Sequence, residues 1–108
     1  MKRGEVWWAD LPPPVGRRPV LLLSRDRAYQ VRTAVTVAEI TRTIRQIPIE
    51  VMLDQSDGMQ VKCAVNLDTM LTIPKTLLQT QITTLNASKM QLIENAIKFA
   101  LNLSRGQT

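Results

Sequence analysis

Arginine and threonine, not histidine, are the residues through which this chain could act on a phosphate group. The sequence has no histidine among its 108 residues. Arg17 and Arg18 open one apolar run of the chain. Thr41, Arg42 and Thr43 close another. A guanidinium can donate two hydrogen bonds to one anion, and a threonine hydroxyl adds a further donor. If the two runs are neighbouring strands, these side chains surround a gap that suits a phosphate.

Arg18 stands directly before Pro19, and this gives its side chain a defined starting direction. The residue before a proline is pushed into an extended conformation. Taken singly, Arg18 would be interpreted as a solvated arginine at a strand start, and Thr41 as a β-favouring threonine on an exposed face. Their combination with Arg17 is what predicts anion binding.

Positive charge is concentrated in the first half of the chain. The formal net charge is +5, from 14 basic and 9 acidic residues. Half of the basic residues lie between positions 17 and 45, where only Asp26 and Glu39 oppose them. All of these are arginines: Arg17, Arg18, Arg25, Arg27, Arg32, Arg42 and Arg45. The alternatives are a nucleic-acid partner and a basic surface without a partner, and the clustering favours nucleic acid.

Several function classes need residues that this sequence lacks. Without histidine a Ser-His-Asp triad is excluded, and with a single cysteine no zinc site or other cofactor is expected. Cys63 lies in an alternating apolar stretch, which predicts a buried, inert thiol. No apolar run approaches the ~20 residues that span a bilayer, and the N-terminus has no signal-peptide core. We therefore expect a cytoplasmic protein with no membrane partner.

The elements that would position these residues are mainly β-strands. Alternating or continuous apolar runs predict strands at 5–9, 19–24, 33–41, 47–53 and 61–67. The run at 19–24 is apolar throughout, which fits a strand covered on both faces. Between the strands, the composition predicts a stiff polyproline-type loop at 12–14, a turn at 54–58 and a short helical turn at 74–78.

A C-terminal helix is predicted from Asn86, a good N-cap, to about Leu103. Its apolar residues form two seams, the first made by Met90, Ile93, Ile97 and Ala100 or Leu101, the second by Leu92, Ala96, Phe99 and Leu103. One seam should pack on the sheet, and the other either widens that contact or meets another subunit. The fold class predicted is mainly β, a small antiparallel barrel or half-barrel with a C-terminal helix. We expect one domain, 1–108, with a flexible tail at 104–108.

Four motifs resemble the MazF/PemK family of toxin endoribonucleases, the mRNA interferases of type II toxin–antitoxin systems. They are KRGEVWWADL at 2–11, GRRPVLLLS at 16–24, the Ile40–Thr41 pair, and LTIPKTLLQTQITTL at 71–85. The resemblance implies an SH3-like, strongly curved antiparallel sheet with a C-terminal helix, a PemK/CcdB-like toxin fold that forms a homodimer. It also implies metal-independent cleavage of single-stranded RNA at short preferred sequences, and a cognate antitoxin as partner.

The same resemblance assigns roles to individual residues. The essential arginine and threonine of the family fall on Arg18 and Thr41, which would stabilise the phosphate when the 2′-OH attacks it. An acidic family position falls on Asp68, and an arginine of some relatives is replaced by Asn66. The RNA-binding residues implied are Arg17, Arg42, Thr43, Asn66 and Asp68. The segment at 10–18 is shorter and richer in proline than in most relatives, which predicts a more open site.

Several of these residues have more than one possible role. The resemblance implies that Arg18 also moves protons, although a guanidinium is protonated at physiological pH. Glu39 shares a strand face with Thr41, so it is either an alternative base or the ion-pair partner of Arg18. Asp68 would either orient Arg18 or read a base edge. Trp7 and Trp8 lie on opposite strand faces, as a base-stacking platform or as packing residues.

Two other functions compete with RNA cleavage. A barrel of this shape could act without catalysis by binding a protein target such as a topoisomerase. A degenerate family member could bind RNA or antitoxin without cutting. The pairing of Arg18 with Thr41 favours the ribonuclease, because a protein-binding toxin needs neither residue.

Overall fold

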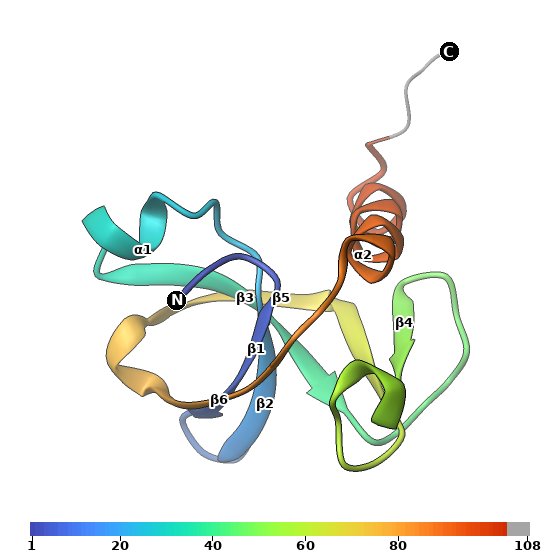
Figure 1. The fold of residues 1–108 in the computed structure, drawn as a ribbon, viewed down its shortest axis with the longest axis horizontal. Helices are drawn as coiled ribbons and strands as arrows, with labels where there is room; N and C mark the ends of the chain where they lie inside the picture. The colour runs from blue at the N-terminus through green and yellow to red at the C-terminus, as the bar shows by residue number, and fades with distance from the viewer. Residues whose placement is uncertain (104–108) are drawn as a thin grey trace.

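A single antiparallel sheet of six strands forms a strongly curved half-barrel, and a C-terminal helix packs against it (Figure 1). The computed structural model describes residues 1–103. The strands are β1 (Glu5–Asp10), β2 (Arg17–Leu22), β3 (Ala34–Thr41), β4 (Glu50–Leu53), β5 (Cys63–Pro74) and β6 (Leu78–Thr84). The helices are α1 (Ala28–Val31) and α2 (Ala87–Ala100), with the 3-10 turns η1 (Gln55–Asp57) and η2 (Lys75–Leu77). The sheet order is β4-β5-β3-β2-β1-β6, and the predicted fold class is confirmed.

The central strand β2 is covered on both faces, as its continuous apolar run predicts. Leu21 belongs to one buried cluster, which includes Ile93 of α2. Val20 and Leu22 belong to a second cluster on the opposite face, with Tyr29 of α1. Burying a leucine or valine side chain contributes about 1.5–3 kcal/mol, so β2 is a rigid support for the residues at its start.

Helix α2 packs on β4 and β5 through the first of its two predicted seams. Ile93 is fully buried, and Met90 and Ile97 pack against the same core. The Asn86 side chain accepts a hydrogen bond from the Lys89 backbone N–H at 2.8 Å, which confirms the predicted N-cap. The helix ends before the predicted Leu103, because the chain turns at Asn102 with φ of 56°. Of the second seam, Ala96 is buried, whereas Leu92, Phe99 and Leu103 are exposed.

Three differences from the predicted elements have physical causes. Strand β4 begins at Glu50 rather than 47, because the Glu50 N–H turns back to the Ile47 carbonyl at 2.9 Å. Strand β5 continues to Pro74 because a bulge opposite the Ala38–Glu39 step takes up residues 67–69, which include the polar Asp68 and Thr69. The prolines at 12–14 form a turn rather than a polyproline segment, closed by the Val15 N–H on the Pro12 carbonyl at 3.2 Å.

Two elements have no counterpart in the prediction. The one-turn helix α1 lies between β2 and β3, and β6 forms an edge strand beside β1. The predicted flexible tail, 104–108, falls outside the described residues. Within residues 1–103 no helix is long and apolar enough to cross a membrane.

The connection between β4 and β5 closes the open side of the half-barrel against β6. Gly58 adopts φ of 94°, and Thr83 of β6 donates a hydrogen bond from its hydroxyl to the Asp57 carbonyl at 2.9 Å. The Asp57 carboxylate, nearly buried, pairs with Lys89 of α2 at 3.4 Å. These contacts join the two edges of the sheet and hold residues 58–61 across from β1 and β6.

Candidate active site

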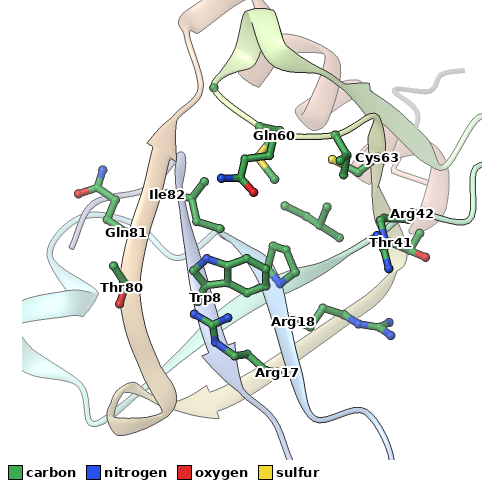
Figure 2. Close-up of a pocket in the computed structure, with 15 residues that line it drawn as sticks. Trp8, Arg17, Arg18, Thr41, Arg42, Gln60, Cys63, Thr80, Gln81 and Ile82 are labelled. Carbon is green, nitrogen blue, oxygen red and sulfur yellow. The ribbon is translucent and has the colours of Figure 1, made fainter.

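A cavity of about 630 Å³ opens at the mouth of the half-barrel (Figure 2). It lies between the start of β2, the end of β3, the segment 58–61 and strand β6. Its walls are formed by Trp8, Arg17, Arg18, Pro19, Ile40, Thr41, Arg42, Gly58, Met59, Gln60, Val61, Cys63, Thr80, Gln81 and Ile82. The cavity therefore brings together the arginines and the threonine that the sequence singles out.

Arg18 and Thr41 come together through the register of β2 and β3. Val20 pairs with Glu39 in this antiparallel ladder. Continued by two residues toward the mouth, the same register brings Arg18 opposite Thr41, and both line the cavity. The predicted position of the pair at the ends of neighbouring strands is confirmed.

The Arg18 guanidinium forms an ion pair with Glu39, from its Nη1 to Oε1 at 3.1 Å. The Glu39 side chain is only 12% exposed, against 37% for Arg18, and Glu39 is not among the residues that line the cavity. The Glu39 carboxylate thus binds the Arg18 guanidinium without itself facing the cavity. Since a guanidinium has five N–H donors, Arg18 retains donors for an anion in the cavity.

The Thr41 hydroxyl is oriented by the backbone that follows it. Its Oγ1 accepts a hydrogen bond from the Thr43 backbone N–H at 3.1 Å, and its own hydrogen is left to donate. Arg42 lines the cavity beside Thr41, whereas the Thr43 side chain does not. Thr43 therefore contributes through its main chain.

The two tryptophans have different surroundings, as their alternation on β1 predicts. The guanidinium carbon of Arg17 lies 4.1 Å from the centre of the Trp8 ring, and both side chains line the cavity. Cation and ring attract one another at this distance. Trp7 packs against the second core cluster, and its indole N–H donates to Glu5 at 2.8 Å. Of the two, only Trp8 faces the cavity.

Asn66 and Asp68 lie on β5 and are not brought into the cavity wall. Asn66 pairs in register with Glu39, directly before the β5 bulge. Its side-chain oxygen accepts the Asp68 backbone N–H at 2.9 Å, so the amide supports the bulge. Asp68 is exposed. The RNA contacts implied for both residues remain predictions.

Two segments of the cavity wall were not predicted from the sequence to be part of the site: residues 58–61, and Thr80 to Ile82 on β6. The Asp57–Gly58 pair signals a turn, and the left-handed Gly58 confirms it. No local pattern signals that this turn meets β6, because the contact with Thr83 joins residues far apart in the chain.

Cys63 lines the cavity but its thiol is not poised for chemistry. The residue is 2% exposed. Burial, reinforced by Asp57 and Asp54, raises the pKa of the thiol to about 11. The predicted burial of Cys63 is confirmed, and the raised pKa agrees with the prediction of an inert thiol. Across residues 1–103, no group of three or more Cys, Asp or Glu side chains could hold a metal ion.

Comparison with known proteins identifies the family. The sequence model of the PemK-like, MazF-like toxins of type II toxin–antitoxin systems matches residues 2–101. The chain belongs to this family. Among MazF relatives, the probable endoribonuclease MazF5 of Mycobacterium tuberculosis is 38% identical over 95% of this chain and 94% of its own length. Endoribonuclease EndoA of Bacillus subtilis is 32% identical over 95% and 96%.

Solved structures of MazF toxins have the same fold. The M. tuberculosis toxin MazF-mt6 superposes with a TM-score of 0.86 at 36% identity, covering 93% of this chain and 98% of its own. A mycobacterial endoribonuclease in complex with its cognate antitoxin superposes with a TM-score of 0.87 at 28% identity, covering 98% and 99%. The family indicated by the sequence motifs is thus confirmed over nearly the whole chain.

Proposed function

We propose that this PemK/MazF-family toxin is an endoribonuclease that cleaves single-stranded RNA at short preferred sequences without a metal ion. The observation that carries the proposal is the meeting of Arg18 and Thr41 in one cavity, with Arg17 and Arg42 beside them. Relatives that match along most of their length are named endoribonucleases, which supports the same activity here. A non-catalytic, topoisomerase-binding toxin is not favoured by these relatives.

In the proposed reaction, the 2′-OH of the RNA attacks the adjacent phosphorus and the bond to the 5′-oxygen breaks. The products are a 2′,3′-cyclic phosphate and a free 5′-OH. Negative charge builds on the phosphoryl oxygens in the transition state, and fixed donors aimed at such charge are usually the largest catalytic contribution. Arg18 supplies N–H donors and a positive charge, and Thr41 donates its hydroxyl hydrogen to a phosphoryl oxygen.

Glu39 acts in this scheme as a positioning residue. Its carboxylate pairs with Arg18 from outside the cavity wall, so it fixes the direction of the guanidinium without touching the RNA. The role of general base is therefore not given to Glu39. The proton transfer by Arg18 that the family resemblance implies stays a prediction.

Two partners are proposed besides RNA. The structural relative bound to its cognate antitoxin supports an antitoxin that covers the basic cavity. The exposed apolar residues Leu92, Phe99 and Leu103 on and after α2 support a homodimer. We place the protein in the cytoplasm, where its proposed messenger RNA substrate is found.

The experiment that tests the function uses purified protein and a mixed single-stranded RNA in the presence of chelator. We expect the wild-type protein to cleave, and Arg18→Ala to slow cleavage by roughly 100- to 1,000-fold. Thr41→Ala should slow it by about tenfold, the worth of one hydrogen bond, and Thr41→Ser should restore most of the rate. Arg32→Ala, an exposed arginine outside the cavity wall, is the matched control. A wild-type protein that cuts nothing, or an Arg18→Ala variant that cuts normally, would refute the proposal.

A further inference from the structure

The cavity wall formed by Trp8, Gln60 and Ile82 has the features of a nucleobase site, and we call it the base wall. Trp8 comes from β1, Ile82 from β6 and Gln60 from the β4–β5 connection. Trp8 and Ile82 are half-buried and present apolar surface to the cavity that also contains Arg18. We propose that the base wall holds one base of the RNA next to the cleaved phosphate, and that Gln60 reads this base. The inference rests on the proposed function.

Gln60 is distinguished from the second glutamine in the cavity by the direction of its amide. The Gln81 amide donates to the Thr84 hydroxyl at 3.0 Å, and Figure 2 shows it pointing away from the cavity. The Gln60 amide points inward, toward Ile82 and Trp8 (Figure 2). Within the described part of the chain, no residue hydrogen-bonds the Gln60 amide. Its donor and acceptor are available to a ligand.

The ring of Trp8 and the guanidinium of Arg17 form a stacked pair in the base wall. Arg17 lies over this ring at 4.1 Å. Bases of single-stranded RNA stack on aromatic rings and on guanidinium planes, at about 1–3 kcal/mol per base for aromatic stacking. Arg17 covers one face of the Trp8 ring, so the base would stack on the outer face of the guanidinium or on the other face of the ring, and Ile82 adds an apolar side.

The segment that carries Gln60 is fixed, as reading a base requires. The preceding residue, Met59, is buried, and its backbone N–H donates to the Asp54 carbonyl at 3.2 Å. The Gln60 carbonyl accepts the Gln55 side-chain amide at 3.4 Å. With the Thr83 contact to Asp57, these bonds hold Gln60 across the cavity from Trp8. Such support from neighbouring residues is what keeps a recognition group in its productive geometry.

The chemistry of an amide specifies which base should fit. A glutamine side chain presents one acceptor and two donors, and it pairs in two-bond fashion with adenine through N6 and N7. We therefore assign adenine as the preferred base. A glutamate at the same place has acceptors only, so it should favour guanine, whose N1–H and N2–H₂ are adjacent donors.

Cleavage mapping on a randomised single-stranded RNA tests this assignment with the full chain. Gln60→Glu should change the preference at one nucleotide position near the cut, from adenine toward guanine, by roughly 5- to 100-fold. Preferences at the other positions should stay. The matched control is Gln79→Glu, an exposed glutamine on β6 that does not line the cavity. An unchanged preference at every position in Gln60→Glu would overturn the inference.

A binding measurement separates this inference from the proposed function. In a Trp7→Phe background, checked for folding by circular dichroism, the fluorescence of Trp8 should be quenched by a short 2′-O-methyl RNA that cannot be cleaved. Gln60→Ala should weaken the binding of adenine-containing RNA by roughly 5- to 100-fold. If wild-type protein shows this binding but never cleaves, the base wall stands and the proposed function fails. If Gln60→Ala leaves RNA binding unchanged and alters only the binding of poly-glutamate, Gln60 contacts an acidic protein partner and the inference is overturned.

Discussion

Replacing Glu39 by glutamine is expected to steepen the salt dependence of RNA binding. Three arginines line the cavity, namely Arg17, Arg18 and Arg42. Glu39 offsets one of these charges through its ion pair with Arg18 at 3.1 Å. Three cations less one anion leave two net positive charges that RNA phosphates can neutralise. The neutral amide of a glutamine cannot offset a charge, so in Glu39→Gln all three cations face the RNA.

The size of the effect follows from counterion release. For single strands, the logarithm of the binding constant falls with the logarithm of salt concentration with a slope of about −0.7 per neutralised phosphate. Two net charges give about −1.4, or about sevenfold weaker binding when salt rises from about 50 to about 200 mM. Glu39→Gln should give about −2.1, or about an 18-fold loss over the same range. Arg42→Ala should give about −0.7, or about a threefold loss.

The assay is fluorescence anisotropy of a short, uncleavable 2′-O-methyl RNA across a series of salt concentrations. A short oligonucleotide limits contacts with arginines outside the cavity. Glu94→Gln is the matched control, because Glu94 pairs with Arg3 at 3.1 Å and neither residue lines the cavity. Its slope should equal that of the wild type. Equal slopes for the wild type, Glu39→Gln and Arg42→Ala would refute the charge count.

Three further predictions concern residues that support the site: their effect on folding stability and the reactivity of the buried thiol. Gly58→Ala should lower the free energy of unfolding by about 1–3 kcal/mol, because φ is 94° there and a Cβ would collide with Thr83; an unchanged urea midpoint would contradict this. Burial raises the pKa of Glu50, but hydrogen bonds from Arg45 outweigh it and hold the pKa below the ordinary value of 4.5. Ionised Glu50 therefore stabilises the folded protein above pH 4.5, and this stability is lost as the pH falls through the folded-state pKa of Glu50. In a plot of unfolding free energy against pH, Glu50→Gln should therefore show a smaller fall on the acid side than the wild type. The same fall in both proteins would exclude this role. Because burial raises the pKa of Cys63 to about 11, about one thiol in 10,000 is ionised at pH 7. A thiol-reactive dye should then label the protein only as it unfolds, and rapid labelling of the folded protein would count against a buried thiol.

The interior strands can be predicted because their burial leaves a pattern in the sequence. Burial on both faces of β2 produces the continuous apolar run at 19–24, and the Asn86 cap marks the start of α2. The edge strand β6 has no such pattern, since most of its residues are exposed and polar. The extension of β5 beyond residue 67 cannot be predicted from the sequence either, because a bulge accommodates polar residues within a continuous strand and so interrupts the apolar alternation.

The residues of the candidate site likewise fall into those that local sequence patterns predict and those that only the tertiary fold brings together. Arg18 and Thr41 stand at the ends of strands that pair directly, so their meeting follows from local patterns and one register. Gln60 and Ile82 meet the other residues only because the half-barrel closes through the Thr83–Asp57 contact. Asp68 shows the converse: a motif places it in the site, but the adjacent bulge leaves it outside the cavity wall.

The most direct test of the central claim is the chemistry of the cleaved ends. RNA cut by the wild-type protein in chelator is analysed by mass spectrometry, alongside the same RNA with a single 2′-deoxynucleotide at the cut position. If Arg18 and Thr41 stabilise a phosphate attacked by its own 2′-OH, the product carries a 2′,3′-cyclic phosphate and a 5′-OH, and the deoxy substrate stays intact at that bond. Cleavage of the deoxy substrate, or a 5′-phosphate on the product, would contradict the account.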